Sequence, residues 1–237
     1  MSTDSKTFVL VHGTAHGGWC WVRVADRLRA LGHKVFTPTL TGVGERSHLM
    51  SADVNLDTHI TDVVNVIKWE ELTDVVLCGH SYGGWVISGV VEQVPDEITS
   101  IVYLDAFMPE DGDQGTDTQS PGSKEAVERA LAAGEHSRIA GSAAQYGLTG
   151  DDLAWVDSKL TPQPIGVSLQ PIRLTGARDR VPMKSFILSR GYNNPAFVAS
   201  YEARKSDPSW RLFDLPCHHD IMVEMPDELT EILIEVA

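Results

Sequence analysis

The clearest chemical signal in this sequence is the run Gly79–Gly83, which reads Gly-His-Ser-Tyr-Gly. An apolar run at 75–77 precedes it and a second apolar run at 85–91 follows it, so the pattern predicts a strand, a sharp turn and a helix. Such a turn exposes the Ser81 hydroxyl at the carboxyl end of a strand, and small glycines let neighbouring backbone pass close by. We therefore predict a nucleophile at Ser81. The alternative is a chance pentapeptide in a glycine-rich loop.

A serine hydroxyl is a weak nucleophile at neutral pH and requires a base, with a carboxylate that orients the base. His219 follows the predicted strand 210–213 and is the expected base, with adjacent His218 as the alternative. Asp179 follows the predicted strand 172–175 and precedes a helix expected to begin near Pro182. The expected catalytic set is Ser81, Asp179 and His219. Asp179 could instead cap that helix or pair with its arginine neighbours, residues 178 and 180.

The third requirement is a pair of N–H donors for an oxyanion hole. Thr14 lies in the glycine- and histidine-rich loop 12–18, directly after a predicted strand, and Tyr82 follows the nucleophile. We assign the backbone N–H groups of Thr14 and Tyr82 to this role. His12 and His16 lack acidic neighbours and a third ligand at suitable spacing, so no metal site is expected. We expect both imidazoles to bond nearby backbone and to hold the loop.

Composition limits the classes of protein to consider. The chain has 237 residues, is 42% hydrophobic and carries a formal charge of −14, with a pI near 4.9. One large domain is expected, and a nucleic-acid or anionic-membrane partner is disfavoured. The first ten residues predict neither a secretory signal nor a membrane span, and three scattered cysteines predict neither a disulfide framework nor a metal site. A cytoplasmic protein without a cofactor is expected.

The hydrophobic periodicity alternates between strands and helices, which predicts an α/β fold with a mostly parallel six-stranded sheet flanked by helices. The core is expected at 1–108 and 168–237, and a helical cap at 109–167, inserted after the fourth strand. The expected strands are 7–11, 33–36, 75–77, 100–105, 172–175 and 210–213; the expected helices are 19–31, 56–69, 85–91 and 226–236 in the core, and 125–133, 136–146 and 150–160 in the cap.

The cap and the loops beside it are expected to shape a substrate pocket. The alternative for each cap residue is that it only packs the cap against the core. The candidate pocket residues are Gly13, His16, Phe107, Met108, Tyr146, Leu148 and Trp155.

Several motifs carry a resemblance to a known family. They are the segments 8–19, 31–35, 79–84 and 104–109, together with the closing segment around His219. Together they resemble the α/β-hydrolase branch that contains plant methyl salicylate esterases, hydroxynitrile lyases and bacterial EstC-type esterases. The resemblance spans nearly the whole chain and is strongest in the first 110 residues. It implies a Ser-Asp-His chain order, and it places the family histidine on His219 and the variable preceding residue on His218.

Two departures from the lyase members are informative. Those lyases carry Thr where this chain has Gly13, and Lys where this chain has Asp220. A lysine would hold cyanide and an aspartate would repel it, so the resemblance implies ester hydrolysis.

We therefore expect a serine carboxylesterase that cleaves a small, largely apolar or aromatic ester through an acyl-serine intermediate. The alternatives are a lactone or amide hydrolase, a hydroxynitrile-lyase-like enzyme, and a receptor-like binding protein with little turnover. The expected partner is a small-molecule ester. The oligomeric state stays open, with a homodimer as one alternative.

Overall fold

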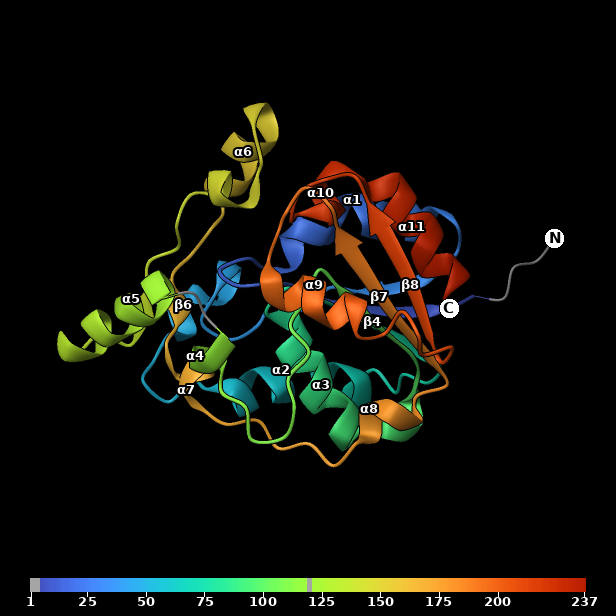
Figure 1. Ribbon diagram of the computed structural model, residues 1–237, viewed down its shortest axis with the longest axis horizontal. Helices are drawn as coiled ribbons and strands as arrows, with labels where there is room; N and C mark the ends of the chain where they lie inside the picture. Colours follow the sequence, from blue (N-terminus) through green and yellow to red (C-terminus); the bar gives the residue numbers. More distant parts are fainter. Residues whose placement is uncertain (1–4, 119–120) are drawn as a thin grey trace.

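The core of the molecule is one six-stranded parallel sheet (Figure 1). The computed structural model describes residues 5–118 and 121–237. The strand order is β2-β1-β3-β4-β7-β8, and every neighbouring pair is parallel. The predicted six-stranded sheet is thus confirmed. The strands are β1 (Thr7–Val11), β2 (Lys34–Phe36), β3 (Val75–His80), β4 (Ile98–Leu104), β7 (Met183–Ser189) and β8 (Trp210–Leu215).

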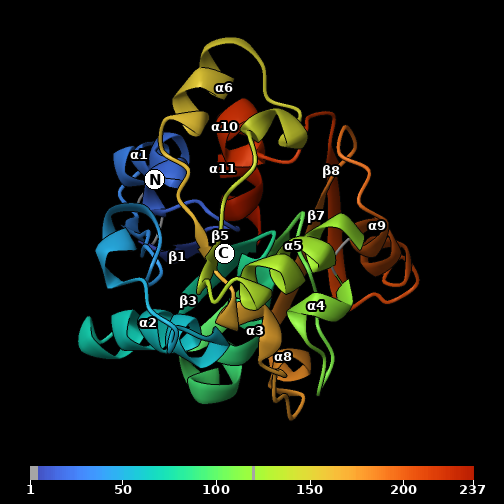
Figure 2. The same cartoon turned by 90° about the vertical axis from the view of Figure 1, so that its left-hand side faces the viewer.

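Helices cover both faces of the sheet because its inner strands are apolar on both sides. In β1, Phe8 and Leu10 join one buried cluster, whereas Val9 and Val11 join the other. One face is covered by α1 (Val22–Ala30), α10 (Ile221–Glu224) and α11 (Pro226–Glu235), and the other by α2 (Leu56–Trp69), α3 (Gly83–Gln93) and α8 (Ala177–Arg180) (Figures 1 and 2). The further core helices are α9 (Pro195–Glu202) and the 3₁₀ turns η1 (Gly18–Trp21), η2 (Gly44–Leu49) and η3 (Pro95–Glu97).

The fifth strand of the sheet lies later in the chain than the sequence predicts. Residues 172–175 form no strand; Ile172 instead exchanges backbone hydrogen bonds with the loop at 112–113. The sheet strand is β7, and it begins where a helix was expected near Pro182. β7 was missed because Lys184 and Ser185 interrupt its apolar run. The Lys184 ammonium is accommodated because it donates to the backbone oxygens of Asp179 and Val181.

The segment 109–167, here called the cap segment, lies beyond the carboxyl ends of the strands (Figure 1). Its helices α5 and α6 match two of the expected helices, but the helix expected at 136–146 is wrong. That stretch holds the short strand β5, a loop containing Gly141, and a 3₁₀ turn capped by Ser142. The elements are α4 (Gly115–Thr118), α5 (Pro121–Ala132), β5 (Ser137–Arg138), η4 (Ala143–Tyr146), α6 (Gly150–Asp157), β6 (Gln163–Pro164) and, at its end, α7 (Gly166–Leu169).

No helix within the described ranges is both long enough and apolar enough to cross a membrane.

Candidate active site

The register of β3 and β4 brings two reactive side chains together. His80 pairs with Leu104 at the ends of these neighbouring strands, so Ser81 and Asp105 follow side by side at the same edge of the sheet. The backbone continues this register, because the Ser81 N–H donates to the Leu104 oxygen over 3.2 Å. Both residues have positive φ angles, 54° at Ser81 and 41° at Asp105. Such angles are uncommon for residues other than glycine, and their strain is typical of functional turns.

Glycines make the Ser81 turn sterically feasible. A Cβ atom at Gly79 would lie 2.6 Å from the Gly83 oxygen, and one at Gly84 would lie 2.0 Å from the Phe107 oxygen. Both contacts are far shorter than van der Waals distance and involve backbone atoms. The helix that follows the nucleophile can therefore pass close to the sheet, as the sequence motif predicts.

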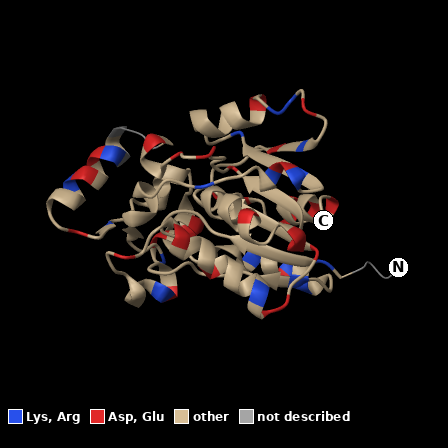
Figure 3. Ribbon diagram, turned by 90° about the horizontal axis from the view of Figure 1, so that it is seen from below, with Lys and Arg blue, Asp and Glu red and all other residues tan. Residues whose placement is uncertain are grey.

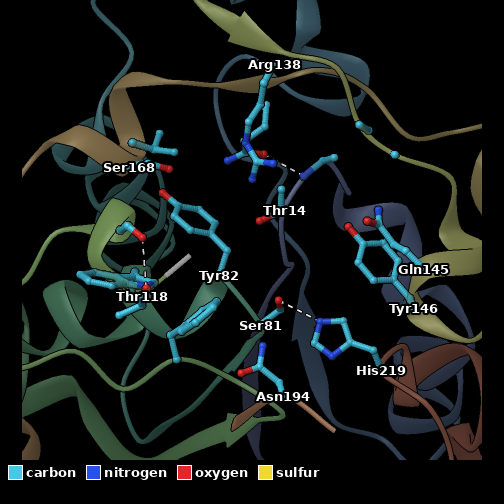
Figure 4. A pocket seen from close by; sticks show the side chains of 18 of the residues that line it. Thr14, Ser81, Tyr82, Thr118, Arg138, Gln145, Tyr146, Ser168, Asn194 and His219 are labelled. Carbon is cyan, nitrogen blue, oxygen red and sulfur yellow. Dashed lines mark hydrogen bonds between the residues drawn. The ribbon is translucent and has the colours of Figure 1, made fainter. Parts of the chain in front are cut away.

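His219 joins the two side chains in one hydrogen-bonded chain. Its Nε2 atom accepts from the Ser81 hydroxyl over 2.9 Å, and its Nδ1 atom donates to Asp105 Oδ2 over 2.6 Å. The other Asp105 oxygen accepts the Ser189 N–H over 3.1 Å. The ring of Tyr192 stacks on the imidazole at a centroid distance of 4.3 Å. Stacking on Tyr192 restrains the tilt of the imidazole ring, and the two hydrogen bonds restrain its rotation. Figure 4 shows the hydrogen bond to Ser81.

The prediction that Asp179 orients His219 is wrong. Asp179 lies in α8 on the surface, its side chain is 72% exposed, and its carboxylate lies 4.0 Å from Arg178 Nε. The error follows from the misplaced fifth strand, because residues 172–175 do not end at the edge of the sheet where Ser81 lies. A signal for Asp105 was present in the sequence: it is a lone carboxylate directly after a buried apolar strand, and that strand follows the nucleophile strand in the chain.

The two adjacent histidines lie in different surroundings. His218 lies at the surface, where its Nδ1 atom is 3.0 Å from Glu224 Oε1. His219 is buried and points to Ser81.

Burial sets the protonation of the hydrogen-bonded chain. Removal from water lowers the pKa of His219 to about 4, although the Asp220 carboxylate opposes this shift. Burial also raises the pKa of Asp105 above its ordinary value, while the Ser189 N–H opposes the rise. The two groups titrate as a coupled pair across a 2.6 Å hydrogen bond. At neutral pH the His219 Nε2 atom is unprotonated and can accept a proton.

A second carboxylate–histidine pair lies behind His219. Asp220 is fully buried, and its Oδ2 atom lies 3.4 Å from His16 Nε2. Burial lowers the pKa of His16, but the Asp220 charge and the hydrogen bonds of His16 with Asp220 and the Thr14 backbone together raise it above 6.5. The charges of His16 and of nearby histidines in turn hold the pKa of Asp220 at about 2 against the effect of burial. The His16 Nδ1 atom donates to the Thr14 oxygen over 2.8 Å, and His12 Nδ1 donates to the Gly13 oxygen. Both loop histidines thus bond nearby backbone, as predicted.

A cavity of about 220 Å³ opens in front of Ser81, between the sheet edge and the cap segment (Figure 4). Thr14 and Tyr82 lie on its wall beside Ser81 and His219. Tyr82 directly precedes α3, so its N–H has no acceptor within the helix. The arrangement is compatible with two N–H donors at one side of the nucleophile.

Of the seven predicted pocket residues, Phe107 and Tyr146 line the cavity and the other five do not. Leu148 is buried in a core cluster, and Trp155 packs edge-on against Trp19. Met108 packs against the other core cluster, His16 faces Asp220, and Gly13 lies beneath Ser81. Four further lining residues, Ser81, His219, Thr14 and Tyr82, were predicted in catalytic roles. Sequence reasoning missed the remaining lining residues, which are Ala15, Trp85, Gly115, Thr118, Arg138, Ile139, Ala140, Gly141, Gln145, Gln163, Val167, Ser168, Tyr192, Asn194 and Phe197.

No group of three or more His, Cys, Asp or Glu side chains in the described part of the chain is arranged to hold a metal ion.

Comparison with known proteins finds esterases among the proteins similar to this chain. The chain is 40% identical over 233 residues to a carbendazim hydrolyzing esterase from Nocardioides sp. (strain SG-4G), covering 94% of this chain and 96% of that protein. Methylesterase 1 from Arabidopsis thaliana is 37% identical over 114 residues, which is 44% of this chain and 40% of the plant protein.

The fold has close structural neighbours. An extracellular alpha/beta-hydrolase from a Paenibacillus species, described as sharing structural and functional homology with tobacco salicylic acid binding protein 2, superposes with a TM-score of 0.84. The two sequences are 25% identical, and the superposition covers 98% of this chain and 99% of the other. The model of the alpha/beta hydrolase family matches residues 8–232. The chain therefore belongs to the alpha/beta hydrolase family.

Proposed function

We propose that the protein is a serine carboxylesterase in which Ser81 is the nucleophile, His219 the general base and acid, and Asp105 the carboxylate that orients the base. The observation that carries the proposal is the continuous chain from Ser81 Oγ through His219 to Asp105, at 2.9 and 2.6 Å, at the edge of a cavity. The 40% identical esterase, which matches along nearly the whole chain, supports the same reaction class.

The geometry supports a two-step reaction. Ser81 Oγ bonds to the ester carbonyl carbon while His219 Nε2 takes the hydroxyl proton. The carbonyl oxygen becomes negative and would be held by the N–H groups of Thr14 and Tyr82. His219 then returns the proton to the leaving alcohol, which yields an acyl-serine. A water molecule repeats the sequence and releases the acid. Asp105 keeps its negative charge and stabilises the transient imidazolium.

The cavity supports a small ester with an aromatic or apolar part. Its lining includes the aromatic side chains of Trp85, Phe107, Phe197 and Tyr192. A volume of about 220 Å³ accommodates a substrate with about one or two rings. The relative named for carbendazim hydrolysis makes carbendazim a natural first compound to test. Three buried free cysteines support the cytoplasmic setting that the sequence predicts.

The position of Gly13 argues against lyase chemistry. A Cβ atom there would lie 2.9 Å from both the Ser81 Cβ and the His80 Nδ1 atoms, so a threonine would displace the nucleophile. Asp220 does not line the cavity; it faces His16. The sequence-based argument that Asp220 repels cyanide in the pocket therefore does not apply, and the contact at Gly13 takes its place.

The decisive experiment is replacement of the nucleophile. Ser81→Ala should lower hydrolysis of p-nitrophenyl acetate to the background rate and abolish labelling by a fluorophosphonate probe, while the circular dichroism spectrum stays native. Assays of wild type with aryl esters, a lactone, an anilide, mandelonitrile and carbendazim separate esterase activity from its alternatives. Full hydrolysis by folded Ser81→Ala would refute the mechanism, and labelling without turnover of any ester would favour a binding protein.

A further inference from the structure

The cavity in front of Ser81 holds a cation that the ester reaction does not use. Arg138 lines the wall opposite the nucleophile, and among the described lining residues the only other ionisable base is His219. Figure 4 shows the Arg138 side chain reaching into the cavity on the side of Thr14, while Ser81 and His219 lie on the far side. No aspartate or glutamate is among the described lining residues. The local charge of the cavity wall is therefore positive, although the whole protein is acidic.

Arg138 lacks the partners that other arginines of this protein have. Arg23, Arg178 and Arg190 each pair with a carboxylate, but no carboxylate of the described residues lies within 4 Å of Arg138. Its Nε atom is inaccessible to solvent and has no hydrogen-bond partner in the described structure. A buried donor without an acceptor costs about 1–3 kcal/mol, and more when it is charged. Burial accordingly lowers the pKa of Arg138. The guanidinium is thus poised to gain from an incoming acceptor.

The backbone around Arg138 is fixed by a short ladder. Arg138 in β5 pairs with Gln163 in β6, and the Gln163 side-chain oxygen accepts the Ala15 N–H over 2.8 Å. Ala15 follows Thr14, one of the two proposed oxyanion donors. The ladder therefore anchors the arginine to the loop that faces the reacting carbonyl, so both contact the same ligand-binding space.

We propose that Arg138 forms a carboxylate-binding subsite, and that the preferred substrates are esters whose end remote from the reacting carbonyl carries a carboxylate. The inference rests on the proposed esterase function and specifies its substrate class. Guanidinium is planar and presents parallel N–H donors that match the two oxygens of a carboxylate. A substrate of this kind supplies the acceptor that Arg138 lacks, and the ester group then lies over Ser81 at the opposite wall.

The test uses pairs of esters that differ only in the remote group. Monomethyl terephthalate and methyl 4-methylbenzoate place it on the acyl side; 4-acetoxybenzoate and 4-methylphenyl acetate place it on the alcohol side. For each pair we define a ratio, kcat/KM for the carboxylate ester divided by kcat/KM for its uncharged partner. In wild type this ratio should exceed one for at least one pair. Arg138→Met, which keeps length and removes charge, should reduce that ratio about 10- to 100-fold, as expected for a lost charge-assisted hydrogen bond. Arg138→Lys should fall between the two.

Matched controls separate this inference from the function on which it rests. Arg129→Met removes an exposed cap-segment arginine that pairs with Glu125, and it should leave both ratios unchanged. Hydrolysis of p-nitrophenyl acetate, which carries no remote carboxylate, measures the basal esterase activity and should be retained in Arg129→Met. If wild type fails on p-nitrophenyl acetate, the esterase proposal fails. If wild type hydrolyses it but Arg138→Met leaves both ratios at the wild-type value, the subsite is refuted and the esterase proposal stands. Thermal melting verifies that each variant is folded.

Discussion

Asp105 and His219 share one hydrogen bond, in which the His219 Nδ1 proton points to the Asp105 carboxylate. The carboxylate is removed from water, and the imidazole that faces it is the nearest group able to offset its charge. A carboxylate in this position selects the tautomer with a proton on Nδ1, which leaves Nε2 free to accept from Ser81. The contribution of Asp105 is therefore chemical more than structural.

Replacement of this carboxylate by its amide should separate the two candidate acids. We expect Asp105→Asn to lower kcat by about 10⁴-fold, because the amide permits the unproductive tautomer. Asp179→Asn, at an exposed position, should change kcat less than about two-fold. Steady-state hydrolysis of p-nitrophenyl acetate measures both. A large loss in Asp179→Asn with normal activity in Asp105→Asn would contradict the observed geometry.

The protonation of His219 should determine the acid limb of the pH–rate profile. Burial lowers its pKa to about 4, so the neutral form that accepts the serine proton persists to more acid pH than in a free histidine of pKa 6.5. We expect the fall of kcat/KM that follows protonation of His219 to have a midpoint well below 6.5. Initial rates within the pH range of native circular dichroism provide the measurement, and a midpoint at or above 6.5 would contradict it.

At this scale the sequence indicated the proposed nucleophile and the proposed base but not the proposed acid. Ser81 and His219 each have local signals, a turn motif and a family histidine. The acid has only a weak local signal, a carboxylate directly after an apolar strand, and other carboxylates such as Asp179 also follow predicted strands. Selection among them needs the strand register, in which His80 pairs with Leu104, and register is a property of tertiary packing.

At the scale of elements, hydrogen bonds connect the strand–turn–helix unit β3–α3 to the loop after β4. The Ser81 oxygen accepts the N–H groups of Gly84 and Phe107, so the nucleophile turn is bonded both to its own helix and to the next strand end. The helix approaches so closely that a methyl group at Gly84 would meet backbone. Stability and nucleophile position are therefore coupled at this point.

A pair of glycine substitutions tests that coupling. Gly84→Ala should destabilise the protein by about 1–3 kcal/mol, because the added Cβ overlaps the Phe107 oxygen, and should reduce activity in the folded fraction. Gly122→Ala, in α5 with no atom of the described residues within 4 Å of the added Cβ, should be neutral or stabilising by up to about 1 kcal/mol. Urea unfolding and active-site titration measure both. Equal stability of the two variants would show that the turn can relax.

Elements with a regular hydrophobic periodicity were predicted at the correct residues. Elements whose position depends on tertiary contacts were not. α2 lies at the residues that its spacing predicts, because its apolar face and its capping Asn55 are both local. β7 was missed, because Lys184 in the sheet is tolerated only through carbonyls of the preceding turn. The cap segment contains short elements whose ends are set by contacts with the core, which periodicity does not encode.

For the molecule as a whole, the surface is rich in charged side chains, whereas the interior contains several neutral histidines. Charged residues of both signs lie mainly on the outer helices and loops (Figure 3), and their sum is −14. The interior instead holds histidines that burial keeps neutral. Their pKa values are lowered to about 3 at His12, about 4 at His59 and His219, and well below 6.5 at His80.

These four histidines should make the protein sensitive to acid. Their folded pKa values lie below the unfolded value of 6.5, so between pH 6.5 and about 4 the unfolded chain binds protons that the native state does not. Stability should fall with pH by up to about 1.4 kcal/mol per unit for each histidine. With a typical total of about 5–15 kcal/mol, we expect acid unfolding between roughly pH 4 and 6. The raised pKa of His16 acts only at higher pH, since His16 is protonated in both states below 6.5.

Proton uptake on acid unfolding provides the measurement. Potentiometric titration should show about three more protons bound by the unfolded chain near pH 5, because the four histidines take up about four while the native protein already holds about one at Asp105, whose pKa burial raises. His48→Gln, at an exposed histidine, should leave the uptake and the unfolding midpoint unchanged. Unfolding without excess uptake in this range would show that the buried histidines are already charged in the native protein.

The edge-on contact between Trp19 and Trp155, at a centroid distance of 5.3 Å, joins the core to the cap segment. Lys159 lies over the first ring and Arg23 over the second, so both indoles experience nearby positive charge. Any movement that lifts the cap segment would separate the rings and expose them to water. The protein thus contains an intrinsic fluorescent reporter: opening should appear as a red shift in tryptophan emission, and Trp155→Phe should reduce that shift, because only Trp19 of the pair remains, without removing the site.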